Sequence, residues 1–234
     1  MRTFRALLNR VNDIQGVPFA ELAKVHGVEW TGSPAHNKRM AGAVVEAALG
    51  LKPSSKPKPD IEPLNIEVKT IPLSDDLRVL EHTKVTSLNP QDVVRDAWEQ
   101  STAYQKLRSI LFVPVVKYDL NDPSRWYIRS PFVWFPSTSE MEQFRKDYES
   151  VRTLLASGRP EDIHSAEPPE GQGEFLIANT GGQSGETTKY EVGERTLVMK
   201  RRAWMLRKRF TRHVVENNIS YAVLLSKEHA KGGT

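Results

Sequence analysis

The sequence predicts an α/β fold in which helices cover a central sheet, and three observations support this. Residues 110–116 (ILFVPVV) form a continuous apolar run, typical of a strand that is covered on both faces. Residues 64–71 (LNIEVKTI) alternate in polarity and are rich in β-branched side chains, as a half-buried strand is. Around these two segments apolar residues recur at helical spacing. Strands mixed with helices favour an α/β domain with a covered sheet.

The N-terminal half is expected to be mainly helical before the first strand. Two short helices are expected, one around residues 4–11 and one over 18–25. Ser33-Pro34 has the form of an N-cap followed by proline in the first helical position, and predicts a helix that runs to about Ala48 and ends near Gly50. Residues 52–59 (KPSSKPKP) predict a loop.

The C-terminal half alternates further helices and strands. A helix is expected from Asn89-Pro90, and a strand or pair of strands over 126–135. Ser137 and Glu140 form a capping box, which predicts a helix behind them. The last expected elements are a polar loop over 158–173, a short strand over 175–178, a glycine-rich loop over 180–185 and a helix over 205–217.

Length and composition predict an ordinary globular protein. The 234 residues fit one large domain or two lobes. The absence of cysteine excludes disulfides, a thiolate nucleophile and a cysteine-ligated zinc. No apolar run has the length of a membrane span, and the N-terminus does not have the pattern of a secretory signal. A cytoplasmic location without membrane contact is therefore expected.

Charge is unevenly distributed along the chain. The net charge is only +4, but eight basic residues and no acid lie between Arg195 and Val215. A local basic face of this kind is compatible with a polyanionic partner. The simpler interpretation is a solvated surface, which is the usual role of a run of charges.

The pattern most informative about chemistry is Pro59-Asp60, six residues, then Glu67-Val68-Lys69. The period of a strand places Glu67 and Lys69 on one face and Val68 on the other, in the core. Two converging carboxylates make a site of hard oxygen ligands suited to Mg²⁺, and the backbone carbonyl of Val68 is a further candidate ligand. One or two ions are expected, with Mn²⁺ as a possible substitute. The alternative without a metal site is an exposed strand with a surface Glu/Lys pair and an aspartate in the preceding turn.

Such a site suits hydrolysis of a phosphodiester. The reaction requires charge on the phosphate to be offset, a water to be activated and the leaving oxygen to be stabilised. Because two carboxylates beside Lys69 favour its charged form, we assign the ammonium to orienting the water and stabilising the transition state.

Glu46 is the candidate for a second metal ligand or a supporting position. Gly42, Glu46 and Gly50 fall at i, i+4 and i+8, on one face of the expected helix. Glycines on either side of a carboxylate allow another backbone or a ligand to approach closely. An ordinary surface glutamate is the equally weighted alternative.

At these residues the chain resembles the MutH family and its relatives among type II restriction endonucleases that cut GATC. The matching segments are PFAELAKVHGV, NKRMAGAVVEAALG, SSKPKPD with LNIEVKTIPL, ILFVPV, SPFVWFP, GEFLI and WMLRKRFT, in chain order over roughly residues 5–217. The most specific part is the spacing of Glu46, Asp60, Glu67 and Lys69.

The resemblance implies a restriction-endonuclease-like fold, a mixed central sheet flanked by helices in a two-armed clamp around a DNA cleft. The chain would then be a single domain, 1–234, with an N-terminal arm over about 1–100 that carries the catalytic residues and a C-terminal arm over 101–234 that carries DNA-reading elements. It implies catalysis by Asp60, Glu67 and Lys69 with Glu46 as an extra acid, and DNA contacts at Lys38 and at Arg108, or Lys106 in the alternative register. The family nicks the unmethylated strand of hemimethylated GATC in mismatch repair. Its partners are double-stranded DNA and MutL, with MutS upstream, and a monomer is expected in isolation.

The chain departs from the family where bases are read. The family's arginine that reads guanine falls in the stretch Ala178-Asn179-Thr180, and asparagine prefers adenine to guanine edges, so Asn179 is the candidate. Met205, beside Trp204, matches the aromatic residue that senses the methyl group. Further DNA contacts are expected in the basic stretch, and the candidates are Arg201, Arg202, Arg207, Lys208 and Arg209.

Three hypotheses follow. The first is a Mg²⁺-dependent, sequence-specific DNA endonuclease of the MutH type. The second, with the same chemistry, is a type II restriction endonuclease that cuts both strands of a related short site. The third is a DNA-binding module without catalysis, in which the carboxylates are surface residues.

Overall fold

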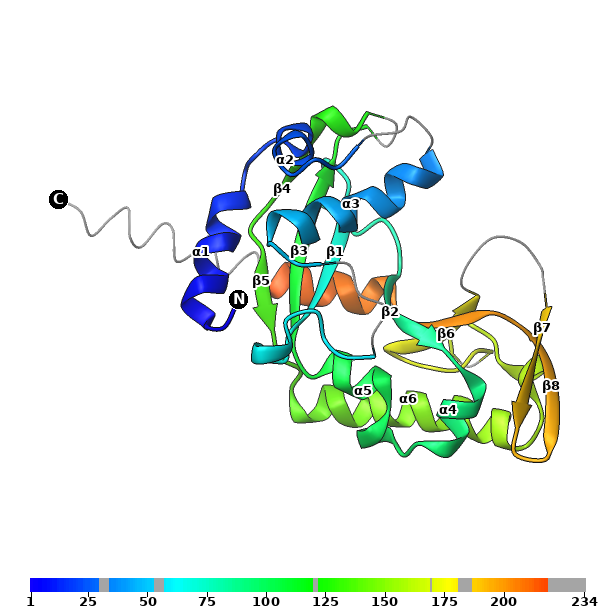
Figure 1. The fold of residues 1–234 in the computed structure, drawn as a ribbon. Coiled ribbons are helices and arrows are strands. Elements are labelled where there is room, and N and C mark those ends of the chain that lie inside the picture. Colours follow the sequence, from blue (N-terminus) through cyan, green and yellow to red (C-terminus); the bar gives the residue numbers. More distant parts are fainter. Residues whose placement is uncertain (30–33, 53–56, 120–121, 169, 181–186, 219–234) are drawn as a thin grey trace. The chain divides into compact units, whose positions relative to one another are not determined.

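The computed structural model describes residues 1–29, 34–52, 57–119, 122–168, 170–180 and 187–218, with the backbone alone for 34–39. It has a mixed α/β architecture, as the sequence predicts, and divides into two compact units that alternate along the chain (Figure 1). Unit 1 comprises 1–81, 110–134 and 208–234, and unit 2 comprises 82–109 and 135–207. The sequence boundary expected near residue 100 therefore falls inside unit 2.

Unit 1 is built on a mixed four-stranded sheet. Its strands are β1 (Glu67–Leu73), β3 (Ile110–Lys117), β4 (Trp126–Ile128) and β5 (Phe132–Trp134). β1 pairs with β3 in parallel, whereas β4 and β5 both pair with β3 in the antiparallel direction. The expected strand over 110–116 is confirmed as the central strand, and its first seven residues are all buried.

Helices cover the sheet of unit 1. They are α1 (Phe4–Ile14), α2 (Phe19–Val25), α3 (Pro34–Ala48) and a helix over 208–218, with short 3₁₀ turns η1 (Glu62–Leu64) and η3 (Pro123–Arg125). Val44 and Val45 of α3 and Val68 of β1 belong to one buried cluster. Phe210 of the 208–218 helix meets Trp134 of β5 at 5.8 Å between ring centroids. The expected N-cap Ser33 lies outside the described residues.

Unit 2 contains a three-stranded antiparallel sheet and a separate two-stranded ribbon. The sheet has the order β2-β9-β6, formed by β2 (Thr83–Leu88), β9 (Arg202–Leu206) and β6 (Leu176–Thr180). The ribbon consists of β7 (Thr187–Val192) and β8 (Arg195–Lys200). The helices are α4 (Pro90–Arg95), α5 (Thr102–Leu107) and α6 (Thr138–Ala156), with 3₁₀ turns η2 (Trp98–Gln100) and η4 (Pro160–Asp162).

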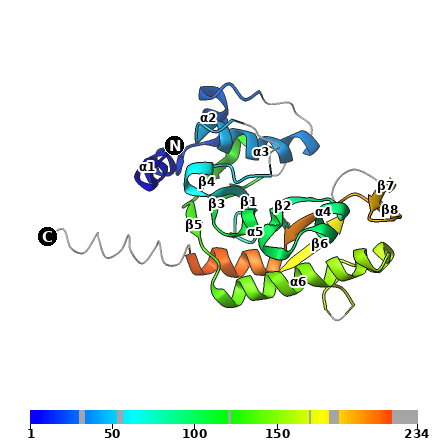
Figure 2. The same cartoon turned by 60° about the horizontal axis from the view of Figure 1, so that its bottom comes forward.

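The long helix α6 supports this sheet and begins as the sequence predicts. The side chain of Ser137 accepts from the Glu140 amide, and the Glu140 carboxylate accepts from the Ser137 amide. α6 packs against β6, and Figure 2 shows it running beneath that strand. Tyr148 of α6 stacks on Trp204 of β9 at 5.2 Å between centroids.

Two expected elements shift, and four strands, β2, β7, β8 and β9, were not anticipated. The helix expected over 205–217 begins at 208, because residues 202–206 are held as a strand by hydrogen bonds to β2 on one side and β6 on the other. The first strand begins at Glu67 rather than residue 64, since Glu62–Leu64 form a 3₁₀ turn. The strands β2, β7 and β8 were missed because they are short and polar on one or both faces.

Candidate active site

The spacing of Asp60 and Glu67 is explained by a small closed loop. Ile61 and Ile66 form an antiparallel bridge, in which the Ile61 amide donates to the Ile66 carbonyl at 2.9 Å and the Ile66 amide to the Ile61 carbonyl at 3.3 Å. Both isoleucines are buried in the core of unit 1. Asp60 and Glu67 are the next pair outward from this bridge. Because side chains alternate along an extended chain, the bridge brings these two acids to neighbouring positions.

The turn that closes this loop depends on Asn65. Residues 62–64 form the 3₁₀ turn η1, and Asn65 follows in the left-handed region, with φ 59° and ψ 35°. Its amide donates to the Glu62 carbonyl at 3.1 Å. Asparagine is one of the few residues with a side chain that adopts this conformation readily. The four residues between the bridged isoleucines thus reverse the chain and return it to β1.

A direct hydrogen bond fixes the Asp60 carboxylate against β1. The amide of Val68 donates to Asp60 Oδ2 at 2.9 Å. This bond leaves the other carboxylate oxygen available to a ligand, and places the Asp60 carboxylate beside the peptide that joins Glu67 to Val68. The half-buried aspartate is therefore held in position by the strand that carries the second acid.

Glu67 and Lys69 form an ion pair on one face of β1, as the strand period predicts. Lys69 Nζ lies 2.5 Å from Glu67 Oε1. The side chain of Glu67 is 1% exposed and that of Lys69 is 19% exposed. Val68 is buried in the core cluster with α3. Burying a carboxylate costs free energy unless the carboxylate is paired. The ion pair with the Lys69 ammonium offsets part of this cost for Glu67.

Glu46 lies in α3 and is partly exposed. The two glycines predicted to flank it have different explanations. Gly50 has φ +71°, so it ends the helix in the left-handed conformation that favours glycine. A Cβ on Gly42 would meet no atom within 4 Å, so no described part of the chain makes the close approach that was expected there.

The candidate ligands suit a hard divalent cation that binds few protein atoms and keeps several of its waters. Within the described residues no group of three or more His, Asp or Glu side chains has the arrangement of a metal site, so Glu46 does not join Asp60 and Glu67 in such a group. Asp60 and Glu67 supply two carboxylates, and Val68, whose carbonyl is the further candidate ligand, directly follows Glu67 in the chain. Mg²⁺ commonly binds through one or two carboxylates and retains several waters, which these residues fit.

Two side chains that were predicted to contact DNA, those of Arg207 and Trp204, are buried in the structure. Arg207 is 1% exposed, and its guanidinium donates to the backbone carbonyls of four residues. The acceptors are Gly173, Ser165, Ala166 and Gln172, at 2.6–3.2 Å. Trp204 is 2% exposed and stacked on Tyr148. Arg207 thus anchors residues 165–166 and 172–173, and Trp204 belongs to the core of unit 2.

The other predicted contacts differ in accessibility. Arg202 is half-buried and donates to the carbonyls of Ala178 and Ile163 at 2.9 and 2.8 Å, and burial lowers its pKa. The Asn179 side-chain oxygen accepts from Ser165 Oγ and from the Thr180 amide. Partly or fully exposed positions are found for Lys106, Arg108, Arg201, Met205, Lys208 and Arg209. The side chain of Lys38 lies outside the described residues.

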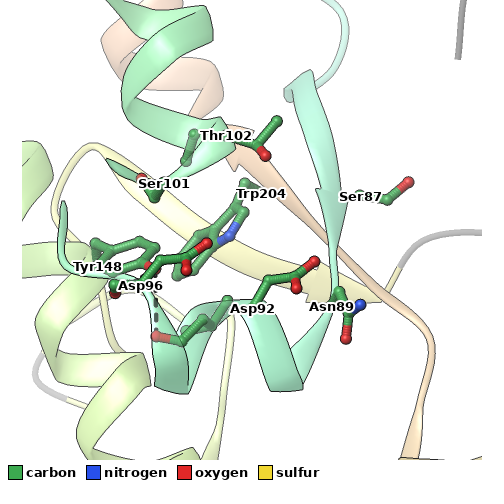
Figure 3. Close-up of a pocket in the computed structure, with 10 residues that line it drawn as sticks. Ser87, Asn89, Asp92, Asp96, Ser101, Thr102, Tyr148 and Trp204 are labelled. Atoms are coloured by element: carbon green, nitrogen blue, oxygen red, sulfur yellow. Dashed lines mark hydrogen bonds between the residues drawn. The ribbon is translucent and has the colours of Figure 1, made fainter. Parts of the chain in front are cut away.

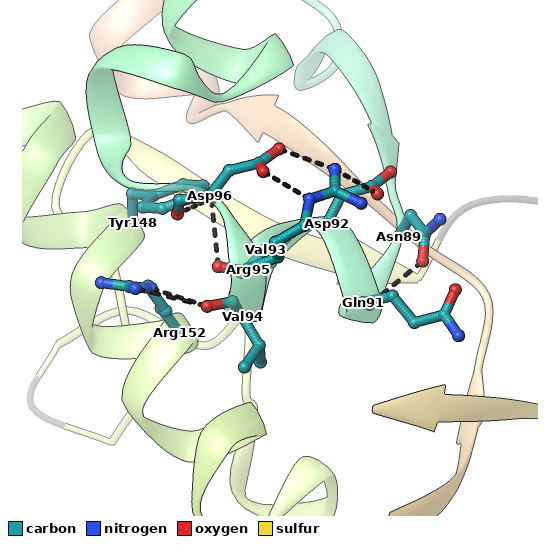
Figure 4. Close-up of polar contacts among 9 residues, drawn as sticks. All are labelled: Asn89, Gln91, Asp92, Val93, Val94, Arg95, Asp96, Tyr148 and Arg152. Atoms are coloured by element: carbon teal, nitrogen blue, oxygen red, sulfur yellow. Dashed lines mark hydrogen bonds and ion pairs between the residues drawn. The ribbon is translucent and has the colours of Figure 1, made fainter. Parts of the chain in front are cut away.

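Unit 2 also contains a small polar pocket, with a volume of about 40 Å³ (Figure 3). Asp92 and Asp96 point toward it from either end of α4, and Trp204 forms part of its wall. Arg95 pairs with both acids, at 2.8 Å to Asp92 and 2.7 Å to Asp96 (Figure 4). This volume suits a few water molecules rather than a nucleobase. The pocket is therefore not a second candidate for the chemistry.

Together these features define a class of site. A strand of a mixed sheet carries Glu67 and its ion-paired lysine, and the Asp60 carboxylate is held against the same strand, which is an arrangement suited to hydrolysis of a phosphodiester with a divalent cation. No described helix is long and apolar enough to cross a membrane.

Comparison with known proteins specifies the family. The family model for the DNA mismatch repair enzyme MutH matches residues 49–147, which include Asp60, Glu67 and Lys69. The chain is 30% identical over 216 residues to the DNA mismatch repair protein MutH of Vibrio cholerae, covering 92% of this chain and 96% of that protein. It is 28% identical to the MutH protein of Shewanella woodyi, covering 92% and 91% of the two chains. The MutH protein of Vibrio vulnificus is 27% identical, covering 97% and 98%.

The chain belongs to the MutH family of DNA mismatch repair enzymes. This membership confirms the resemblance found in the sequence, and with it the prediction that the chain is an enzyme, a DNA endonuclease.

Proposed function

We propose that this chain is a Mg²⁺-dependent, sequence-specific DNA endonuclease of the MutH type, which nicks the unmethylated strand at a short site such as GATC during mismatch repair. The observation that supports the proposal most is the closed loop that brings Asp60 beside Glu67, with Lys69 paired to Glu67 on the same strand. Double-stranded DNA is the substrate. MutL, with MutS, is the proposed protein partner. The proposed location is the cytoplasm, and the chain is proposed to be a monomer when it is not bound to a partner.

Each residue has a proposed role at the reacting phosphate. Asp60, Glu67 and the Val68 carbonyl would hold one or two Mg²⁺ ions, and Mn²⁺ would substitute for them. When bound, the ion offsets charge on the phosphate and lowers the pKa of a bound water. Lys69 orients the attacking water and donates to the phosphate oxygen on which charge develops. Glu46 supports a second ion or the water around the first.

The two units are proposed to be the arms of a restriction-endonuclease-like clamp. Unit 1 contains the candidate catalytic residues, and unit 2 contains Asn179 and Met205, to which we assign base reading. Asparagine at the first of these positions favours an adenine edge. The recognition sequence therefore need not be the one that the family usually cuts.

Cleavage of supercoiled plasmids with and without GATC sites tests the proposal. We expect nicked product only with a divalent cation, and loss of product in Glu67→Gln, because the substitution removes one of two carboxylate ligands. Glu142→Gln, which neutralises an exposed glutamate on α6, is the matched control and leaves cleavage unchanged. Metal-dependent cleavage that survives Glu67→Gln contradicts the proposed site.

The form of the product separates the proposal from its nearest alternative. A nicked circle that accumulates on hemimethylated DNA, and faster with MutL and ATP, supports the mismatch repair enzyme. Linear product without a nicked intermediate supports a type II restriction endonuclease. Binding of DNA without any cleavage supports the third hypothesis, a DNA-binding module.

A further inference from the structure

The ribbon β7–β8 (residues 187–200) presents one anchored face and one exposed face. On the anchored face Val192, Leu197 and Met199 are 5–7% exposed. β7 packs against α4 and β8 against η4, within unit 2. Arg195 also donates to the carbonyl of Ala156, the last residue of α6, at 3.2 Å. Figure 1 shows the two strands as a hairpin distinct from the β2-β9-β6 sheet. The ribbon thus packs on unit 2 through one face, and its other face is exposed to solvent.

The exposed face carries cations toward its open end. Thr187 pairs with Lys200 and Lys189 with Val198, so the two lysines are diagonal neighbours on one face. Both lysines are exposed, and Val198 between them is 54% exposed. Arg201, the next residue after β8, is also exposed, but it donates to Thr188 Oγ1 at 3.4 Å. Thr188 pairs with the buried Met199, so this contact lies on the anchored side and Arg201 is not counted with the two lysines.

The acids of the ribbon lie at its other end. Glu194 is in the turn between the two strands, and Glu191 accepts from the Thr196 hydroxyl at 3.0 and 3.1 Å. Within the described residues, Lys189, Lys200 and Arg201 have no carboxylate at ion-pair distance. Other arginines of unit 2 do pair with acids. They are Arg95 with Asp92 and Asp96, Arg152 with Glu149, Arg159 with Asp162, and Arg207 with Glu167.

We propose that the exposed face of the β7–β8 ribbon is a DNA-docking surface, in which Lys189 and Lys200 contact phosphates of a duplex. Clustered cations without acid partners complement a polyanion, and a two-stranded ribbon is narrow enough to lie along the major groove. The contacts are to the backbone, so they position the duplex without reading its sequence. Lys189 lies outside the basic stretch seen in the sequence, and only the strand register places it beside Lys200.

This inference rests on the proposed function, since it needs DNA as the substrate. It is tested by the affinity of the full chain for two duplexes, one with a GATC site and one with that site scrambled, over a series of salt concentrations. Ca²⁺ replaces Mg²⁺ to prevent cleavage. The variant is Lys189→Gln/Lys200→Gln. The matched control is Arg145→Gln/Lys146→Gln, which removes two exposed cations from α6 of the same unit.

We expect the ribbon variant to bind both duplexes more weakly by the same factor. The slope of log K against log salt falls in magnitude by about 2, because each lost phosphate contact removes about 0.9. The control variant keeps the slope of the unsubstituted protein. Circular dichroism and the melting temperature verify that both variants are folded.

The outcomes separate this inference from the proposed function. If the unsubstituted protein binds neither duplex, the proposed function fails. If it binds and the ribbon variant keeps its slope, or loses no more than the control, only the docking surface is overturned. A loss confined to the GATC duplex also overturns it, because that result indicates base reading instead of phosphate contact.

Discussion

At the scale of single residues, Asn65 has the most specific consequence for the site. Its left-handed conformation closes the turn between the bridged Ile61 and Ile66, and so places Asp60 beside Glu67. Valine at φ 59° is strained, by about 1–2 kcal/mol or more, whereas glycine adopts this conformation without strain. The turn is therefore a positioning element for the two acids.

We expect Asn65→Val to lower the cleavage rate at saturating DNA and to raise the Mg²⁺ concentration that half-maximal cleavage requires. Asn65→Gly restores both quantities to near the values of the unsubstituted protein. A titration of cleavage rate against Mg²⁺ for the three proteins measures this. Equal metal requirements in all three would show that the turn does not position the ligands.

Arg207 and Arg201 are both in the basic stretch, but substitution of Arg207 should lower stability, whereas substitution of Arg201 should weaken DNA binding. Arg207→Met leaves several buried carbonyls without donors and should reduce the free energy of unfolding by about 3 kcal/mol. Arg201→Gln changes an exposed side chain, so stability should stay within about 0.5 kcal/mol while DNA binding weakens. Urea unfolding and DNA binding measured on both variants check the prediction. A stable Arg207→Met protein that has lost only DNA binding would reverse the assignment.

At the scale of elements, a buried aspartate joins α6 to β6. Asp147 is 3% exposed and accepts from the amides of Glu174, Phe175 and Leu176 at 2.8–2.9 Å, as well as from Gln143. Asp147→Ala removes the acceptor of three amides at the start of the strand, and we expect the free energy of unfolding to fall by about 3 kcal/mol. Glu142→Ala on the same helix is the control and should change little. Urea unfolding measures both.

The contact between α6 and α4 predicts a pH dependence at high pH. Burial, and then the charge of Asp96, raise the pKa of Tyr148 from 10.0 to about 12. Its hydroxyl donates to the carbonyls of Val93 and Asp96 at 3.3 and 3.4 Å (Figure 4). Because the folded protein holds this proton more tightly than the unfolded chain, its contribution to stability is complete below pH 10.0 and is lost as pH rises through about 12.

We therefore expect the urea midpoint of the unsubstituted protein to decline more over this interval than that of Tyr148→Phe, which has no proton to lose there. Absorbance titration of tyrosinate supplies a second readout. One tyrosine with a pKa near 12 should be present in the unsubstituted protein and missing from Tyr148→Phe. Parallel declines in the two proteins would count against a perturbed Tyr148.

At the scale of the whole molecule, the sequence predicts local structure better than it predicts contacts between remote segments. The capping box at Ser137, the apolar strand over 110–116 and the face shared by Glu67 and Lys69 follow from spacing alone, and all are present. The buried roles of Arg207 and Trp204 were not predictable, because they depend on carbonyls and rings supplied by remote segments. For the same reason a run of basic residues separates into a strand, a buried anchor and an exposed helix start only after folding.

The division into two units leads to a last prediction about Mg²⁺. The candidate ligands Asp60 and Glu67 belong to unit 1, so a bound ion stabilises that unit directly. At a concentration about 100 times its dissociation constant, a ligand adds about 2.7 kcal/mol to the stability of the state that binds it. We expect Mg²⁺ to slow hydrogen exchange of the β1 and β3 amides of unit 1, while exchange of the β9 amides of unit 2 changes less.

The matched variant is Asp60→Asn/Glu67→Gln, which conserves shape and removes both charges. In this variant Mg²⁺ should no longer protect β1, although the fold of unit 1 persists because Ile61 and Ile66 still pair through their backbones. Protection of β1 by Mg²⁺ that survives in the variant would place the ion elsewhere. Equal protection of β1 and β9 in the unsubstituted protein would mean instead that the ion couples the two units, because a site confined to unit 1 has no direct contact with the β9 amides.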